Sequence, residues 1–406
     1  MLDLPLQHKF DRKNLELNAL LEVTQSINAN KTEDELYKIF NFTVRANLQV
    51  KKLALFVFDE IWSCKVNYGT TKSLNKCKLP LIFHKETGIR RIVDFNEPEF
   101  TEFEMLIPVV HKTEVLALVF VGGLETHNLD FEDGLKFLQA LSNITIVAIE
   151  NKKLARKQLE REAYRKELEI ASDVQQFLFP EKLPNTERLK MEASYLPHDM
   201  VGGDYYDFIP INKNQFLICV ADVSGKGVAA ALMMSNFQAS LRTLLRQTPN
   251  LREIVEALNF QVMENAKGEK FITFFGAIYD LELKTLVYIN AGHNPPILIK
   301  SSGEQVLLEE GCIVLGALPE LPFINEGFIT GLNDFLLFCY TDGVTETSSE
   351  NGEDFGQESL LKYFSKKENV LKNLSTIHQD LIVALDTHKG RNAYHDDITM
   401  LSCRVS

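Results

Sequence analysis

A long stretch without glycine or proline, residues 144–178, divides this chain of 406 residues. Its middle part, NKKLARKQLEREAYRKELE, alternates basic and acidic residues at the spacing that forms i,i+4 ion pairs on a solvent-exposed helix. Pro180 and Pro184 end the pattern, because proline cannot continue a helix. The chain is therefore predicted to hold two folded regions joined by a helical connector over residues 144–184.

The connector has an imperfect heptad seam. Val147, Leu154 and Leu168 keep a seven-residue register. Arg161 and Gln175 fall in the same register and interrupt it with polar side chains. Two interpretations remain open on this pattern: a homodimer joined through a parallel coiled coil, and a solvated monomeric linker.

The length of the chain exceeds the size at which a single hydrophobic core usually splits into domains. Residues 1–143 are predicted to open with two amphipathic helices, the second capped by Thr32 through Glu35, and to continue into short strands separated by turns. Residues 185–406 alternate β-rich runs with helices, which favours antiparallel sheets with helices packed outside. The predicted fold class is α+β and multidomain.

Composition and charge disfavour several classes of protein. The chain is 45% hydrophobic and 24% charged, as expected for globular domains. A formal net charge of -13 without a basic stripe argues against nucleic acid as a partner. No apolar stretch is long enough to span a bilayer and no signal peptide is recognisable, so we expect a cytoplasmic protein without a membrane partner. The six cysteines are scattered and are expected to be reduced.

Acidic residues stand beside the ends of predicted buried strands in the second region. They belong to the motifs VGGDYYDF, CVADVSGKG, CYTDGVTE and YHDDITML, and are Asp204, Asp222, Asp342, Asp396 and Asp397. A carboxylate at the edge of a core is costly unless it is paired or coordinates a cation, and few basic residues lie nearby in the sequence. Each aspartate alone is equally explained as a turn residue, but the set together favours a shared metal site.

The ligand types indicate which metal would bind. Aspartate oxygens without His or Cys pairs at metal spacing favour Mg²⁺ or Mn²⁺ over Zn²⁺. Two such ions roughly 3.5–4 Å apart can share a hydroxide that attacks a phosphoester. The residues alone therefore indicate two-metal phosphoester hydrolysis.

The turn that follows Asp222 contains Gly225, Lys226 and Gly227. SGKG lacks the Ser/Thr and the upstream glycine of a P-loop, and GKGVAA lacks the acidic residue of a dinucleotide-binding motif. Two interpretations remain open: the amides of this turn bind phosphate at a helix N-terminus, or the glycines simply let the turn close.

Five blocks occur in order across residues 201–401: VGGDYYDF, ADVSGKGVAAALMM, NAGHNPP, YTDGVTE and DDITML. Together they closely resemble the SpoIIE/RsbU branch of metal-dependent PPM protein phosphatases, and the preceding ELEIASDVQQFLFPEKLP is similar to the helical lead-in of that branch. Residues 17–124, with LLEVTQSINANKTEDELYKIF, are similar to the opening of GAF sensor domains. The resemblance implies a GAF-like α/β sensor domain followed, beyond the connector, by a PPM-type α-β-β-α sandwich of two antiparallel sheets flanked by helices.

The resemblance also implies a ligand set for two Mn²⁺ or Mg²⁺ ions. Asp222 would bridge both ions. The backbone carbonyl of Val223 and the carboxylate of Asp204 would complete one site, and Asp342 with Asp396 would hold the other.

Three further residues bear on the chemistry. Asp397 matches the second position of the family's DD or DN pair and is not expected to be a direct ligand. Ser224 in DVSG stands where many relatives have the histidine of DGHG, which suits protonation of the leaving group. His293 in NAGHNPP is the alternative general acid, since histidine titrates near neutral pH, although a histidine in such a turn more often hydrogen-bonds the backbone.

The implied function is a metal-dependent serine/threonine phosphoprotein phosphatase of bacterial signalling, regulated by the N-terminal sensor domain. The implied substrate is a phosphorylated anti-sigma-factor antagonist of the STAS type. Two alternatives stay open on the residues: a catalytically silent phosphatase-like interaction module, and a two-metal phosphodiesterase or small-molecule phosphatase. The complete set of aspartates favours an enzyme.

Overall fold

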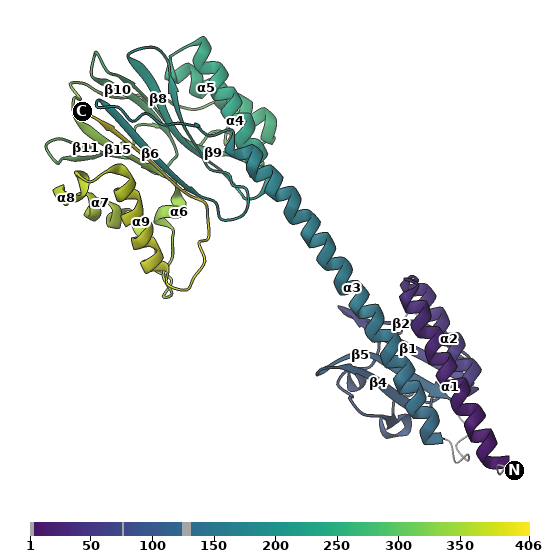
Figure 1. Cartoon of the computed structure of the whole chain (residues 1–406). Coiled ribbons are helices and arrows are strands. Elements are labelled where there is room, and N and C mark those ends of the chain that lie inside the picture. The colour runs from purple at the N-terminus through teal and green to yellow at the C-terminus, as the bar shows by residue number, and fades with distance from the viewer. Residues whose placement is uncertain (1–3, 75–76, 124–130) are drawn as a thin grey trace. The chain divides into compact units, whose positions relative to one another are not determined.

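The structure is a computed structural model that describes residues 4–74, 77–123 and 131–406. The chain divides into two compact units, Met1–Glu162 and Ala163–Ser406, which are described separately below. The division falls within the long helix α3, Phe131–Gln176, and inside the segment for which the sequence predicts a helical connector (Figure 1).

The N-terminal unit is built on one five-stranded antiparallel sheet with the strand order β2-β1-β5-β4-β3. Helices α1, α2 and the first part of α3 pack on one face of the sheet, as Figure 1 shows. The elements are α1 (Leu4–Asn28), α2 (Glu33–Leu48), β1 (Lys52–Asp59), β2 (Ile61–Tyr68), η1 (Leu81–Phe83), β3 (Arg90–Arg91), η2 (Ile92–Asp94), β4 (Met105–His111) and β5 (Glu114–Gly122). The sequence EVLALVFVGGL, residues 114–124, predicts a strand here, and its last residue, Leu124, lies outside the described residues.

The helix boundary predicted near residue 32 is confirmed. Thr32 accepts a hydrogen bond from the backbone N–H of Glu35, and the Glu35 carboxylate accepts one in return from the Thr32 N–H at 2.8 Å. This capping box satisfies backbone donors that an uncapped helix would leave unpaired. Helix α2 then places Leu36, Phe40 and Val44 on the sheet, at the spacing of one helical face.

The other face of this sheet is filled by the unit's own aromatic side chains. Phe83, Phe100 and Phe120 are fully buried, with ring centroids 4.7–5.2 Å apart. Tilted and edge-on contacts of this kind add to the stabilisation that comes from burial. These side chains occupy the space between the sheet and the turns η1 and η2.

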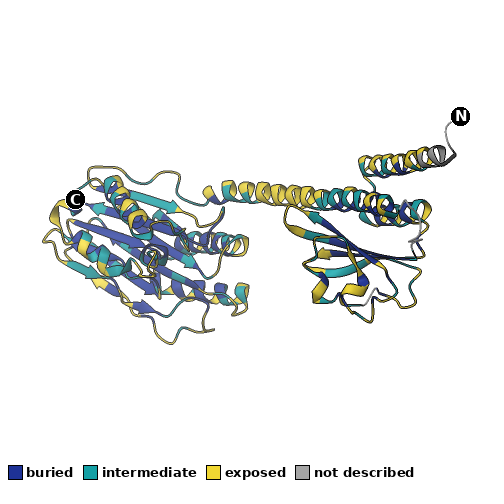
Figure 2. Cartoon of the chain, turned by 90° about the horizontal axis from the view of Figure 1, so that it is seen from below, coloured by how far each residue is buried: buried dark blue, intermediate teal, exposed yellow. Residues whose placement is uncertain are grey.

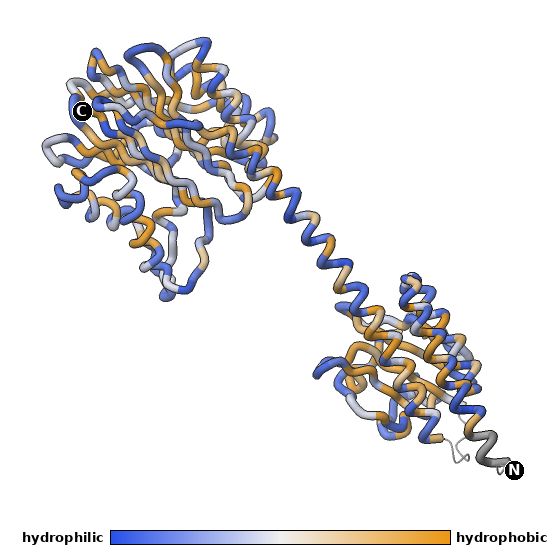
Figure 3. The backbone as a smooth tube through the Cα atoms, viewed as in Figure 1, coloured by the Kyte–Doolittle hydropathy of each residue, from blue (hydrophilic) through white to orange (hydrophobic). Residues whose placement is uncertain are grey.

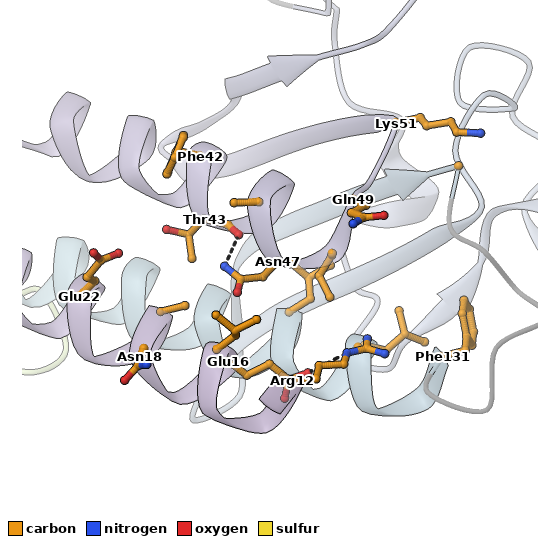
Figure 4. Close-up of a pocket in the computed structure, with 18 residues that line it drawn as sticks. Arg12, Glu16, Asn18, Glu22, Phe42, Thr43, Asn47, Gln49, Lys51 and Phe131 are labelled. Atoms are coloured by element: carbon orange, nitrogen blue, oxygen red, sulfur yellow. Dashed lines mark hydrogen bonds and ion pairs between the residues drawn. The ribbon is translucent and has the colours of Figure 1, made fainter. Parts of the chain in front are cut away.

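A cavity of about 750 Å³ lies between α1, α2 and the start of α3, on the helical side of the sheet (Figure 4). Its lining mixes polar and apolar groups. The buried Glu16 carboxylate on this wall is 2.9 Å from Lys13 Nζ and 3.5 Å from Arg12 Nε. None of the motifs that define the predicted metal site contributes to this cavity.

The C-terminal unit is a four-layered α-β-β-α sandwich. One sheet has the order β13-β10-β9-β8-β7, with β14 also paired to β10, and the second has the order β12-β11-β15-β16-β6. Helices α4 and α5 cover the first sheet, and α6 to α9 cover the second. The strands are β6 (Leu189–Leu196), β7 (Tyr205–Pro210), β8 (Gln215–Val223), β9 (Ile272–Asp280), β10 (Thr285–Ala291), β11 (Ile297–Lys300), β12 (Gln305–Leu307), β13 (Gly311–Cys312), β14 (Gly327–Ile329), β15 (Phe335–Tyr340) and β16 (Ile398–Val405). The helices are α4 (Val228–Gln247), α5 (Leu251–Ala266), α6 (Asp342–Thr345), α7 (Gly356–Phe364), α8 (Lys367–Val370) and α9 (Leu374–Lys389).

Three hydrophobic cores hold these four layers together, one between the sheets and one under each helical layer. The strands are therefore covered on both faces. Figure 2 shows that most of their residues are buried, and Figure 3 shows that hydrophobic residues run along the strands. The predicted antiparallel character holds for all the described strand pairs of this unit except one. The short strand β13 runs parallel to β10, with Asn290 opposite Gly311.

An ion pair between the half-exposed Arg242 and the buried Asp207 joins α4 to the first sheet. Arg242 Nε lies 2.8 Å from the carboxylate of Asp207, which is fully buried on β7, and its Nη2 donates to the other oxygen at 3.0 Å. The Tyr205 hydroxyl donates to the same carboxylate. Removing Arg242 would leave the buried Asp207 carboxylate without a compensating charge. The contact therefore fixes α4 against β7, which begins just after Asp204.

The end of α3 packs on the C-terminal unit through Gln175. Its side chain donates to the carbonyl of Gly202 at 2.7 Å and accepts from the Gly202 N–H at 3.2 Å. Gln175 is buried by these contacts, which explains why a polar residue interrupts the predicted heptad seam there. The exposed apolar residues Ile170 and Val174 lie on a different face of the helix from Gln175, and the exposed Phe177 directly follows the helix.

No helix within residues 4–74, 77–123 and 131–406 is long and apolar enough to cross a membrane.

A buried histidine joins α9 to the second sheet. His378 is 2% exposed, and its two ring nitrogens lie 2.9 Å from Ser194 Oγ on β6 and 2.8 Å from Ser402 Oγ on β16. Burial lowers the pKa of His378 from 6.5 to about 4. The imidazole is therefore neutral at pH 7 and links the helix to the sheet as a hydrogen-bonding group.

The low pKa makes the stability contribution of His378 depend on pH. Between pH 6.5 and pH 4 the unfolded imidazole binds a proton that the folded one does not, so stability falls as the pH falls, by up to about 3 kcal/mol. We expect His378→Asn to remove this contribution, so that the stability difference between wild type and variant narrows from pH 7 to pH 4. Hydrogen exchange of β16 peptides measures it, because the single tryptophan, Trp62, lies in the other unit.

The control is His388→Asn, a change on the same helix at a histidine that is not enclosed. It should leave the pH dependence of the wild type intact. A difference between wild type and His378→Asn that stays constant from pH 7 to pH 4 would contradict the assignment.

Candidate metal centre

The aspartates that the sequence singled out lie at the ends of strands from both sheets. Asp204 directly precedes β7 and Asp222 is the penultimate residue of β8, and the two strands pair with Tyr205 opposite Ala221. In the other sheet, Asp342 follows β15 and Asp396 precedes β16. Because β15 and β16 are antiparallel, the end of one lies beside the start of the other.

Asp204 is the most enclosed of these residues, with 1% of its surface exposed. Its Oδ2 accepts hydrogen bonds from Thr341 Oγ1 at 2.8 Å and from Thr399 Oγ1 at 2.5 Å, both on the opposite sheet. Burial raises the pKa of Asp204 well above its usual range, and the neighbouring Asp222 raises it further. Asp204 therefore joins the two sheets at the centre of the acidic cluster.

Asp222 and Asp342 have perturbed acidity for the same reasons. Burial raises the pKa of Asp222 to about 7, with further contributions from Asp342 and Asp396. Burial also raises the pKa of Asp342 to about 6, with further contributions from Glu346 and Asp396. Carboxylates brought together in a partly dry site resist ionisation unless a cation compensates them.

Glycines leave room for backbone atoms to approach the cluster. A Cβ atom on Gly203 would lie 2.8 Å from the Val223 carbonyl oxygen, so this oxygen faces the loop that contains Asp204. A Cβ atom on Gly343 would lie 2.0 Å from the carbonyl oxygen of Asp397. The turn after Asp342 therefore packs directly on the backbone of the Asp396–Asp397 pair.

Asp397 acts on the backbone of the Asp204 loop. Its carboxylate accepts hydrogen bonds from the N–H groups of His198 at 2.7 Å and Gly203 at 2.8 Å. These contacts place Asp397 beneath the loop as a positioning residue. That Asp397 is not a direct metal ligand stays a prediction.

The turn with Gly225, Lys226 and Gly227 lies beside the cluster. Lys226 Nζ is 3.0 Å from Asp396 Oδ2 and donates to the His395 carbonyl. On the other side of the turn, Lys270 Nζ donates to the carbonyl of Ser224 at 2.9 Å.

The proposed role of His293 as general acid is wrong on this geometry. The ring is 4% exposed, its Nδ1 lies 2.8 Å from Thr273 Oγ1, and its backbone N–H donates to Asn290 Oδ1 at 2.7 Å. Burial lowers the pKa of His293 to about 4. An enclosed imidazole that is not protonated to imidazolium at neutral pH is a poor general acid, and the hydrogen bonds of His293 instead stabilise the turn at the end of β10.

Sequence reasoning missed residues that hold the cluster in place. Thr341 directly precedes Asp342, and Thr399 lies two positions after Asp397, so both threonines are close in the sequence to predicted site residues. This closeness could have indicated that Thr341 and Thr399 belong to the site. Nothing in the sequence pattern indicated that Gln175 or Lys270 would reach this region.

The carboxylates are gathered but do not converge on one point. In the described ranges, no three His, Cys, Asp or Glu side chains are arranged to hold an ion as they stand. Asp204 is stabilised by hydroxyl groups, Asp397 by backbone N–H groups and Asp396 by Lys226.

The donor set fits hard divalent cations. It consists of aspartate oxygens and the Val223 carbonyl, the ligand types that Mg²⁺ and Mn²⁺ prefer. The buried carboxylates with raised pKa values would each gain a compensating charge. The arrangement is therefore suited to binding two ions at the edge of both sheets.

Comparison with known proteins supports this assignment. The family model for stage II sporulation protein E (SpoIIE) matches residues 212–406. The phosphoserine phosphatase RsbU of Bacillus subtilis is 31% identical over 243 residues, which cover 59% of this chain and 70% of RsbU. Protein IcfG of Synechocystis is 26% identical over 330 residues, 73% of this chain, and the chain spans 51% of the length of IcfG.

A solved structure agrees with the fold of the C-terminal unit. The SiaA-PP2C domain of Pseudomonas aeruginosa matches with a TM-score of 0.54 at 18% identity, covering 61% of this chain and 99% of that domain. At this identity the likeness concerns the fold, which is the mixed α+β fold with antiparallel sheets described above. With the acidic motifs, the family model and the match to RsbU together, this chain belongs to the SpoIIE family of PP2C-type (PPM) protein phosphatases.

Proposed function

We propose that this protein is a metal-dependent serine/threonine phosphoprotein phosphatase of bacterial signalling. The observation that supports it most directly is the gathering of Asp204, Asp222, Asp342 and Asp396 from four separate motifs at one edge of two sheets. Burial raises the pKa values of Asp204, Asp222 and Asp342, as expected for carboxylates gathered in a site that a cation would compensate. RsbU and RsbP of Bacillus subtilis, which match this chain, are named phosphoserine phosphatases.

Two Mn²⁺ or Mg²⁺ ions are proposed as the cofactors. Asp222 would contact both ions, the Val223 carbonyl and Asp204 would complete one site, and Asp342 with Asp396 would hold the other. When bound, such ions lower the pKa of a water molecule and make it a nucleophile at neutral pH. The chain's own part is to orient the carboxylates and to shield them partly from solvent.

The substrate is proposed to be a phosphoserine or phosphothreonine on a protein, of the STAS type that serves as an anti-sigma-factor antagonist. The family membership supports phosphoprotein chemistry over a phosphodiesterase, and the complete aspartate set supports an enzyme over a silent interaction module. To separate a phosphoprotein phosphatase from a phosphodiesterase, the rates of hydrolysis of a phosphoserine protein and of a nucleotide diester are compared.

The N-terminal unit is proposed to be a GAF-like sensor domain that regulates the phosphatase through α3, with the three segments bounded at 1–143, 144–184 and 185–406. The central antiparallel sheet with helices on one face supports this fold. The bond between Gln175 and Gly202 supports the route, because Gly202 is two residues from Asp204. The protein is proposed to act in the cytoplasm.

Substitution of the aspartates tests the proposed activity. We expect Asp222→Asn and Asp342→Asn each to lower Mn²⁺-dependent phosphate release from a phosphoserine protein by about 100-fold or more, because each removes a charge that holds an ion. Asp334→Asn is the matched control, since Asp334 is exposed at the opposite end of β15 from Asp342. Wild-type protein that releases no phosphate from any phosphoester would support the interaction-module alternative.

The threonines that hold Asp204 supply a second prediction. Thr341→Val keeps the size of the side chain but removes the hydroxyl group that donates to Asp204 at 2.8 Å. We expect Mn²⁺ affinity to fall by about 10- to 100-fold, as for other groups that orient a metal ligand. Thr341→Ser retains the hydroxyl and should restore most of the affinity. Equal affinities of the valine variant and the wild type would show that Asp204 needs no such support.

The exposed stripe on α3 supports a proposed homodimer. Ile170, Val174 and Phe177 follow one another at four- and three-residue spacing and are 57–84% exposed. We expect light scattering to give a dimer for the full-length protein and a monomer for the double variant Ile170→Asp and Val174→Asp. Glu162→Lys, a charge change at an exposed residue that belongs neither to this stripe nor to the heptad seam, is the control and should remain dimeric. A monomeric wild type would leave the solvated linker as the correct interpretation.

A further inference from the structure

Lys226 brings a positive charge into the acidic centre. Its Nζ lies 3.0 Å from Asp396 Oδ2 and donates to the carbonyl of His395. The ammonium group therefore contacts one of the two carboxylates that are proposed to hold one of the ions.

A divalent ion and this ammonium group are alternatives at the same carboxylate. Both neutralise Asp396, and two cations this close would repel each other. An ion bound by Asp342 and Asp396 therefore has to displace Lys226 from Asp396. The contact between Lys226 and Asp396 is in this sense a competitor of the metal.

The surroundings of Lys226 allow such a displacement. Its side chain is 45% exposed and that of Asp396 is 38% exposed, so solvent reaches the ion pair that they form. It lies between Gly225 at φ 92° and Gly227 at φ 73°, in a turn whose backbone favours glycine. Lys270 differs, because it is partly buried and binds the Ser224 carbonyl of the same turn.

A displaced Lys226 would have a second partner in the proposed reaction. A phosphoserine substrate brings a doubly charged phosphate to a centre with a high density of carboxylates, in a chain of net charge -13. The lysine is tethered beside that centre, and an ammonium group is a common phosphate ligand. Its release by the metal would thus supply a cation when the phosphate arrives.

We propose that Lys226 is an internal counter-ion of the Asp342–Asp396 site, which competes with the divalent ion and, once displaced, binds the phosphate of the substrate. This inference rests on the proposed phosphatase function. It adds one residue that acts in two successive steps, ion binding and substrate binding.

Metal binding tests the first step without turnover. Calorimetric titration of the full-length protein with MnCl₂ should give about 3- to 5-fold tighter binding of one ion in Lys226→Met, in keeping with the loss of an exposed ion pair. Lys226→Arg retains the charge and should bind Mn²⁺ like the wild type. Lys213→Met, at an exposed lysine in the turn between β7 and β8, is the control for a general change of charge. Unchanged or weaker Mn²⁺ binding by Lys226→Met would overturn the counter-ion role.

Phosphate binding tests the second step. With saturating Mg²⁺, inorganic phosphate should bind about 10-fold more weakly to Lys226→Met than to the wild type, while Lys213→Met is unaffected. Equal phosphate affinities of the wild type and Lys226→Met would overturn the substrate-binding role. Neither titration requires hydrolysis, so a protein that binds Mn²⁺ and phosphate as expected but releases none from phosphoproteins would refute the proposed function alone.

Discussion

The C-terminal unit is organised around the burial of Asp204. A carboxylate with 1% exposure is costly, and here the cost is offset by two threonine hydroxyl groups from the opposite sheet. The same constraint explains the glycine at 203, which brings the Val223 carbonyl close, and the contact of Asp397 with the loop. A divalent cation would complete this compensation, so the affinity for metal is a direct consequence of the buried charge.

The sandwich makes this arrangement rigid. Antiparallel pairing of β7 with β8 and of β15 with β16 brings strand ends from distant parts of the sequence to one edge. Helix α4 is held to the first sheet by the bidentate pair of Arg242 and Asp207. The His378 bridge fixes α9 to the second sheet. Regular elements therefore position the ligands, whereas the Lys226 turn is the exposed and adaptable part of the site.

The connector helix contributes a contact of a different kind. Its last turn reaches the Asp204 loop through Gln175, and its exposed apolar residues lie on a different face. One face of α3 thus meets the phosphatase unit while another is available for a second copy of the chain. A shift of this helical turn would move Gly202, to which Gln175 is hydrogen-bonded. The residues proposed to mediate dimerisation are therefore adjacent to the residue proposed to mediate regulation.

The sequence by itself determined the helical connector, the α+β class, the capping box at Thr32 and the acidic motifs, because these follow from periodicity, proline, and residue types in short windows. It could not decide which polar residues meet across the sheets. The support of Asp204 by Thr341 and Thr399, the burial that makes His293 neutral, and the pairing of Lys226 with Asp396 each join residues far apart in the chain. The role of Gln175 in the predicted heptad seam was ambiguous for the same reason, because its hydrogen-bond partner, Gly202, is distant in the sequence. Only the tertiary structure decided these contacts, because the energy of a buried polar group depends on the partners that folding brings to it.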